Sequence, residues 1–324
     1  MAAPLGLGYL SSVLKREGYK DVSFVDGTLD ELTPPQTIEI IKKNGIPDII
    51  GIQVYTGAHN WAKEFIALGR KEMPDTKTIV GGPHISGLKE LAMEYIEPDF
   101  GVAGEGEQAI VEFVKFLEGE IDDPAEVTGL LFKKEGKWER ARNEAGYITD
   151  YNALPMPDWE ILKPDNYFNL MQSATLPLKG KRPVPIMTSR GCPYLCTFCA
   201  DSSIMTQSRK MRYRSAENVV NEIKFLKDKY GVDEILFSDD NITMDMNQSE
   251  ELFGLMIREE LNVNWRAPNG IRIDRLNENL VKKMAQSGGY YVGVGIETGN
   301  TEMMRVMKKH LKLETVEPAL KMLN

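Results

Sequence analysis

The sequence has little cysteine, no long apolar run and no excess of positive charge. Its three cysteines, Cys192, Cys196 and Cys199, lie within one stretch of eight residues. That grouping does not suit the disulfide framework of a small secreted protein, and it does suit a metal site. No apolar run approaches the length of about 20 residues that a transmembrane helix needs, and no basic segment followed by an apolar core marks a signal peptide. We therefore expect a cytoplasmic protein with no membrane partner.

The charge balance and the length limit which class of protein this chain can belong to. The 39 Lys and Arg residues are outnumbered by 48 Asp and Glu residues, which gives a net charge of −9. Because such a chain is poorly suited to bind a polyanion, we do not expect a nucleic-acid partner. The 324 residues leave room for two domains. Helix-like segments stand at both ends of the chain, at 5–17 and 303–324, so we expect a piece of a longer protein.

The first part of the chain alternates strand and helix patterns, which favours a parallel sheet with crossover helices. Strands are predicted at 22–26, 48–55, 76–82 and 100–104, and helices at 35–43, 61–72 and 107–117. We interpret residues 1–125 as a Rossmann-like α/β domain that lacks its first strand. A hairpin over 127–141 and a proline-containing stretch over 142–182 predict a connecting region at 126–182.

The alternation resumes from residue 183 and predicts a second domain over 183–324. Strands are expected at 185–190, 233–238, 264–267 and 290–296, and helices at 216–230, 249–260 and 278–287. Ser215 is the predicted N-cap of the first of these helices. Four successive β/α units indicate a β/α barrel of the TIM type, or part of one.

The three cysteines are spaced C-x3-C-x2-C directly after the first strand of this domain. Thiolates suit iron–sulfur clusters or zinc, but a structural zinc site needs four ligands. The sequence has no fourth cysteine, and its three histidines, His59, His84 and His310, are far from the loop in sequence. Three ligands leave one metal position open for a small molecule. Inert cysteines, or zinc completed by a distant histidine, remain the alternatives.

This cysteine motif, with the aromatic Phe198 before its last cysteine, resembles the signature of the radical S-adenosylmethionine (SAM) superfamily. The resemblance implies a [4Fe–4S] cluster on Cys192, Cys196 and Cys199, whose fourth iron binds the methionine part of SAM. One electron from the cluster would then cleave the sulfonium and yield a 5′-deoxyadenosyl radical. It further implies SAM contacts at the strand ends, namely Phe198, Asp239, Asp240, Arg272, Glu297 and Thr298. A turn or helix cap at the two aspartates and a surface ion pair at Arg272 are the plain alternatives.

The first domain resembles the cobalamin-binding domain that precedes many radical SAM enzymes. Short glycine-containing segments after the predicted strands carry this resemblance, and their order along the chain fits. It implies cobalamin contacts at Leu7, Gly8, Thr56, Gly57, Gly81, Gly82, Gly104 and Glu105. The Asp-x-His-x-x-Gly motif that supplies a histidine to cobalt is not present. A single Gly-Gly pair is common in proteins, so the resemblance depends on the whole ordered set of segments.

Together the two resemblances imply a cobalamin-dependent radical SAM enzyme, most simply a methyltransferase that acts on an unactivated carbon of a small molecule. An electron donor such as flavodoxin or ferredoxin would be its partner. An oxidative cyclase or a ring-rearranging enzyme is the alternative with the same layout. A methylthiotransferase would need a second cluster and a basic RNA module, and an iron–sulfur electron carrier would need a fourth cysteine.

Overall fold

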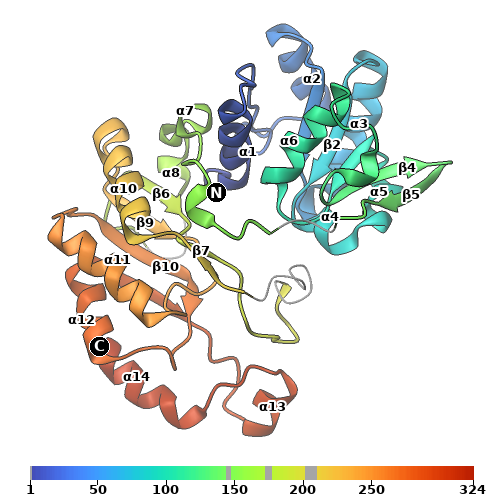
Figure 1. Ribbon diagram of the computed structural model, residues 1–324. Helices are drawn as coiled ribbons and strands as arrows, with labels where there is room; N and C mark the ends of the chain where they lie inside the picture. The colour runs from blue at the N-terminus through green and yellow to red at the C-terminus, as the bar shows by residue number, and fades with distance from the viewer. Residues whose placement is uncertain (1, 144–146, 172–176, 201–209) are drawn as a thin grey trace. The chain divides into compact units, whose positions relative to one another are not determined.

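The computed structural model describes residues 2–143, 147–171, 177–200 and 210–324. The chain divides into two compact units (Figure 1). One comprises Gly6–Ile148, and the other comprises Thr149–Asn324 with the first few residues of the chain. Within the described residues, no helix is both long and apolar enough to cross a membrane.

The N-terminal unit is built on a five-stranded sheet in the order β1-β2-β3-β4-β5. Strands β1, β2 and β3 are parallel to one another, and β4 is antiparallel to both of its neighbours, β3 and β5. The strands are β1 (Ile49–Gln53), β2 (Lys77–Gly81), β3 (Phe100–Val102), β4 (Leu130–Lys134) and β5 (Lys137–Arg140). The helices are α1 (Leu5–Arg16), α2 (Pro34–Asn44), α3 (His59–Glu72), α4 (Pro83–Leu88), α5 (Glu90–Ile96) and α6 (Gly106–Leu117), with short 3-10 turns η1 (Thr56–Ala58) and η2 (Pro124–Glu126).

Each face of this sheet packs against its own set of helices. Neighbouring residues of β2 point to opposite faces, because side chains alternate along a strand. Val80 joins a core with Phe65 of α3 and Met93 of α5, whereas Ile79 joins a second core with Phe113 of α6. Burying each large apolar side chain contributes about 1.5–3 kcal/mol. Helices on both faces of a mainly parallel sheet confirm the expected Rossmann-like arrangement.

Three sequence-based expectations for this part of the chain need correction. The predicted strand at 22–26 is not formed, because no neighbouring strand supplies its hydrogen bonds and β1 is the edge of the sheet. Helices α4 and α5, which the sequence pattern does not predict, occupy the connection between β2 and β3. The hairpin of β4 and β5, predicted as part of the connecting region, belongs to the N-terminal unit, because β4 pairs with β3.

The second unit is built on four parallel strands in the order β11-β10-β9-β6. Its strands are β6 (Pro183–Ile186), β9 (Glu234–Phe237), β10 (Asn264–Ile271) and β11 (Gly289–Val294), with a small antiparallel pair, β7 (Ser189–Arg190) and β8 (Arg212–Tyr213). Its helices are α10 (Ala216–Tyr230), α11 (Met246–Arg258), α12 (Glu278–Gln286), α13 (Thr301–Val306) and α14 (Val316–Leu323), the last preceded by a 3-10 turn, η5 (Leu313–Thr315). Consecutive strands lie side by side, as in a β/α barrel, so the expected partial barrel is confirmed.

Local signals explain where the helices of this unit begin and end. The Ser215 side chain accepts a hydrogen bond from the Asn218 amide and caps α10, as predicted, and Gly231 ends the helix with a φ of 65°. Between the sheet and α11, the rings of Phe253 and Trp265 stack with centroids 4.7 Å apart. The helix-like pattern at 303–324 is interrupted, because α13 and α14 are separate helices.

The connecting stretch holds short helices rather than only extended chain. The described part contains η3 (Tyr151–Ala153), α7 (Trp159–Leu162), η4 (Pro164–Tyr167) and α8 (Phe168–Met171). Trp159 is buried, and its indole N–H donates to Glu222 of α10 at 2.8 Å. The same carboxylate lies 2.5 Å from the Arg214 guanidinium, and both side chains are almost fully buried. Trp159 thus fixes this stretch to the barrel through its buried ring and its hydrogen bond to Glu222, a residue that is itself paired within the barrel.

Candidate functional site

The cysteine loop, residues 191–200, follows β7 at the carboxyl edge of the barrel sheet. All three thiols are half-buried, and none forms a disulfide. The Cys199 amide donates to the Cys196 carbonyl at 3.1 Å, which turns the chain between these two ligands. Burial raises the pKa of the Cys196 thiol. Arg190, just before the loop, donates to the Tyr151 hydroxyl at 3.0 Å and so anchors the start of the loop.

The donor set of this loop fits an iron–sulfur cluster. Within the described parts of the chain, no three His, Cys, Asp or Glu side chains converge closely enough to hold one metal ion. A cluster has no such requirement, because each thiolate binds a different iron atom. Three soft ligands in one loop, and no fourth cysteine anywhere in the sequence, match a cluster with one open iron.

The two predicted aspartates follow β9 and lie in different surroundings. The buried Asp239 carboxylate accepts hydrogen bonds from the amide and hydroxyl of Thr188, at 3.1 and 2.7 Å, and from the Ser189 hydroxyl at 2.5 Å. Burial raises the pKa of Asp239, although these hydrogen bonds by themselves would lower it. Asp240 is exposed. Asp239 therefore ties the end of β9 to the segment before the cysteine loop, and its predicted contact with SAM stays a prediction.

Arg272 follows β10 and is largely buried. Its Nε and Nη2 donate to the two carboxylate oxygens of Asp274 at 2.9 and 2.8 Å, and its Nη1 donates to the Lys309 carbonyl at 2.7 Å. The guanidinium also lies over the ring of Tyr194 in the cysteine loop, 3.8 Å from the ring centroid. These donors face protein groups, so the geometry gives Arg272 a role in holding the cysteine loop. Its predicted pairing with a carboxylate of SAM stays a prediction.

Glu297 and Thr298 follow β11, and Glu297 has a left-handed backbone with a φ of 66°. The Lys309 ammonium donates to the Glu297 carboxylate at 2.9 Å and lies 5.7 Å from the centroid of the Phe198 ring. Phe198 is half-exposed. The structure therefore brings Phe198, between the last two cysteines, and Glu297 to the same lysine. Thr298 accepts a hydrogen bond from the Asn300 amide through its hydroxyl, at 3.1 Å.

Sequence reasoning missed two residues of this region. Tyr194 stacks on Arg272, and Lys309 links Glu297 to the cysteine loop. Tyr194 lies inside the motif, so its position pointed to a role. Lys309 lies in an ordinary run of charged residues, and a charged run alone does not distinguish a solvated surface from a site.

The predicted cobalamin contacts of the N-terminal unit gather after its parallel strands. Thr56 and Gly57 lie in η1 after β1, and Gly81 and Gly82 lie at the end of β2. Gly82 has a φ of 97°, and a Cβ there would lie 3.1 Å from the backbone N and O of Val54. A Cβ on Gly57 would meet nothing within 4 Å. The carboxyl ends of parallel strands form the usual ligand edge of such a sheet, so these segments fit a bound cofactor.

The remaining predicted contacts surround the same edge. Gly104 follows β3 with a φ of 108°, and its amide donates to the Ser86 hydroxyl at 2.9 Å. Glu105 is buried, and its carboxylate accepts a hydrogen bond from the Ile148 amide at 3.0 Å. Leu7 and Gly8 lie in the first half of α1. Glu105 thus has a structural partner in addition to its predicted role.

Two histidines lie beside the predicted cobalamin contacts. The rings of His59 and His84 stack with centroids 5.4 Å apart, and His84 Nδ1 lies 3.3 Å from the Thr56 hydroxyl. Burial, together with the nearby His59, lowers the pKa of His84. A neutral imidazole that contacts Thr56 is therefore part of this edge near neutral pH.

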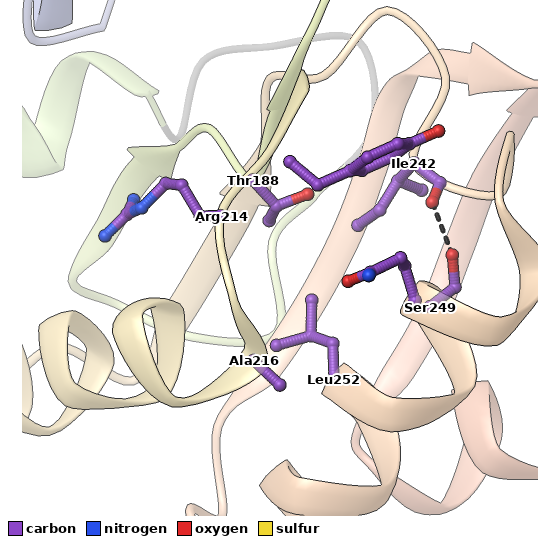
Figure 2. A pocket seen from close by; sticks show the side chains of 8 residues that line it. Thr188, Arg214, Ala216, Ile242, Ser249 and Leu252 are labelled. Carbon is purple, nitrogen blue, oxygen red and sulfur yellow. Dashed lines mark hydrogen bonds between the residues drawn. The ribbon is translucent and has the colours of Figure 1, made fainter. Parts of the chain in front are cut away.

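The second unit contains a small pocket (Figure 2). The Thr188 side chain points into it from one side, and Leu252 of α11 lines the opposite side. The Ser249 hydroxyl donates to the Ile242 carbonyl at 2.6 Å across one wall. The complete lining is Thr188, Tyr213, Arg214, Ala216, Ile242, Gln248, Ser249 and Leu252. None of the predicted SAM or cluster residues lines this pocket.

Each of the two parts of the chain matches a known protein family. Residues 2–114 match the B12 binding domain, and residues 186–324 match the radical SAM superfamily. The chain has a B12-binding domain followed by a radical SAM domain. The order of the two domains confirms the resemblance that the sequence motifs indicated.

Individual relatives of this B12-binding radical SAM protein differ in their reactions. It is 29% identical to the cytidylyl-2-hydroxyethylphosphonate methyltransferase of Streptomyces wedmorensis, over 98% of this chain and 66% of that protein. It is 26% identical to the anaerobic magnesium-protoporphyrin IX monomethyl ester cyclase of Cereibacter sphaeroides, over 99% of this chain and 51% of that protein. The chain thus spans about half to two-thirds of the length of these relatives.

A solved structure shares the fold of the whole chain. The radical SAM methyltransferase TsrM of Kitasatospora setae, solved with cobalamin and a [4Fe–4S] cluster bound, matches 99% of this chain and 64% of its own, with a TM-score of 0.80. The two sequences are 18% identical, so this similarity concerns the architecture.

Proposed function

We propose that this protein uses a [4Fe–4S] cluster on Cys192, Cys196 and Cys199 to cleave SAM reductively. The observation that carries the proposal is the loop of three thiols at the carboxyl edge of four parallel strands, where β/α barrels hold their active sites. When bound, the cluster and SAM supply a 5′-deoxyadenosyl radical. A reducing protein such as flavodoxin or ferredoxin would provide the electron.

The protein's own residues bind and orient SAM. Glu297 would accept hydrogen bonds from ribose hydroxyls; the position of its partly exposed carboxylate after β11 supports this role. Phe198 offers an aromatic surface, and Asp240 and Thr298 offer polar groups at the same edge. Asp239 and Arg272 hold the cysteine loop close to the strand ends, Asp239 through Thr188 and Arg272 through the ring of Tyr194.

We further propose that the N-terminal edge binds cobalamin and that the reaction is a methyl transfer to an unactivated carbon of a small molecule. The glycines at the ends of β2 and β3 leave the backbone open to a large cofactor. The Streptomyces relative favours methyl transfer. Oxidative cyclisation is the second candidate, since the Cereibacter relative is named as a cyclase.

Anaerobic reconstitution tests both parts separately. The protein is loaded with iron and sulfide, and then incubated with SAM and dithionite. We expect one equivalent of 5′-deoxyadenosine and methionine for each SAM cleaved, and neither product from a Cys196→Ala variant. Titration with hydroxocobalamin should change its visible spectrum in both proteins, because the cobalamin edge is in the other unit. Zinc in place of iron, or no 5′-deoxyadenosine from a fully loaded protein, would contradict the proposal.

A methylated product would then distinguish methyl transfer from cyclisation. With a candidate substrate and methyl-labelled SAM, a methyltransferase incorporates the label into its product. A cyclase yields a product without it.

A further inference from the structure

The segment Met307–His310, between α13 and η5, lies against the cysteine loop. The Thr197 amide donates to the Met307 carbonyl at 3.1 Å. From the barrel side, Arg272 donates to the Lys309 carbonyl at 2.7 Å and to the His310 carbonyl at 3.3 Å. The segment is therefore held both by the loop that carries the thiols and by the residue after β10.

The backbone of this segment is unusual. Lys308 and His310 have φ values of 53° and 54°, a left-handed conformation that residues with a Cβ rarely adopt. Such residues persist where the surrounding contacts over-determine the conformation, and they concentrate at functional sites. The two turns place the side chain of Lys309, the residue between them, on the inner side of the segment, where it is only 13% exposed.

The Lys309 ammonium lies close to two groups of the proposed site. It is 2.9 Å from the Glu297 carboxylate and 5.7 Å from the centroid of the Phe198 ring. Phe198 lies between the predicted cluster ligands Cys196 and Cys199, so the ammonium lies beside the cysteine loop. One largely buried cation thus pairs with the predicted ribose acceptor and lies near the loop that carries the predicted cluster ligands.

We infer that Lys309 is a positioning residue that couples the cluster to the SAM ribose site. The inference rests on the proposed function. A cluster gains one negative charge when it is reduced, and a nearby cation in a poorly solvated position favours that form. The same ammonium holds the Glu297 carboxylate toward the position where ribose hydroxyls would bind. Lys309 therefore raises the reduction potential of the cluster and strengthens SAM binding.

Redox titration of the anaerobically loaded full chain tests the first effect. In Lys309→Met, the midpoint potential followed by the EPR signal of the reduced cluster should move to more negative values. At a fixed potential, the ratio of reduced to oxidised cluster should fall several-fold; tenfold corresponds to about 59 mV for one electron. Lys309→Arg keeps the charge and should restore the potential. Lys308→Met is the matched control, because it removes a neighbouring exposed lysine charge.

Equilibrium binding of SAM to the oxidised protein tests the second effect. We expect the Kd to rise several-fold in Lys309→Met and to stay near the original value in Lys309→Arg and Lys308→Met. Lys309→Gln provides a second neutral variant if Lys309→Met does not load its cluster. An unchanged midpoint potential in either neutral variant with a full iron content would overturn the inference. An equal shift in Lys309→Arg would also overturn it.

These outcomes are separable from failure of the proposed function. If the unmodified protein forms 5′-deoxyadenosine while the neutral variants keep its potential and its Kd, only the inference fails. If the unmodified protein loads no cluster, the proposed function fails, and the inference fails with it.

Discussion

Gly82 offers the sharpest test of how the backbone builds the predicted cobalamin edge. Its φ of 97° and ψ of −176° lie in a region that is essentially reserved for glycine. An alanine Cβ would also lie 3.1 Å from the backbone N and O of Val54, and these atoms cannot move freely because both take part in backbone hydrogen bonds. Gly82→Ala therefore meets both backbone strain and a steric contact.

The size of the effect follows from these two terms. The backbone conformation costs about 1–3 kcal/mol for a residue with a Cβ, and crowding in a packed region costs about as much. We expect Gly82→Ala to lower the free energy of unfolding of the N-terminal unit by about 2–4 kcal/mol. With a typical urea dependence of about 2 kcal/mol per M, the unfolding midpoint should fall by about 1–2 M.

The assay is urea unfolding followed by circular dichroism, with Gly57→Ala as the matched control. Gly57 belongs to the same predicted edge, but its φ is not positive and a Cβ there would meet nothing within 4 Å. The control should unfold within about 0.5 kcal/mol of the original protein. Equal midpoints for the two variants, or a larger loss in Gly57→Ala, would refute this account of the edge.

Two further predictions concern the barrel. Glu222→Leu should lower the free energy of unfolding by about 3–5 kcal/mol in urea titrations, because it removes the carboxylate that neutralises the buried Arg214 guanidinium. Glu222→Leu with Arg214→Met should cost less than the sum of both single changes, and additivity would contradict this. Burial raises the pKa of Asp239, so its contribution to stability is full below the unfolded pKa near 4 and is lost as the pH rises through the folded pKa. Asp239→Asn should therefore gain stability relative to the original protein between pH 4.5 and 7.5, and a difference independent of pH would contradict that cause.

Several features of this protein could be predicted because they depend on residues close together in sequence. The spacing of Cys192, Cys196 and Cys199 predicts a cluster ligand set without reference to the rest of the chain. The Ser215 cap and the apolar face of α10 are similarly local. Alternating strands and helices were enough to predict both sheets, because the period of apolar residues distinguishes the two elements.

Other features depended on partners that sequence spacing does not specify. The segment at 22–26 has the pattern of a strand but finds no neighbour to complete its hydrogen bonds, and the β4–β5 hairpin pairs with β3 rather than standing alone. The sequence pattern of a strand depends on one segment alone, whereas a strand forms only when a second segment supplies its hydrogen bonds.

The sequence by itself determined which residues can hold a cluster, and at which strand ends polar groups would gather. Only the tertiary structure decided what those polar groups contact: Asp239 binds Thr188, Arg272 stacks on Tyr194, and Lys309 pairs with Glu297. The physical reason is that charged and polar side chains are satisfied by whichever donors and acceptors the fold brings within about 3 Å. Those partners lie between 12 and 78 positions away along this chain, beyond the reach of any local pattern.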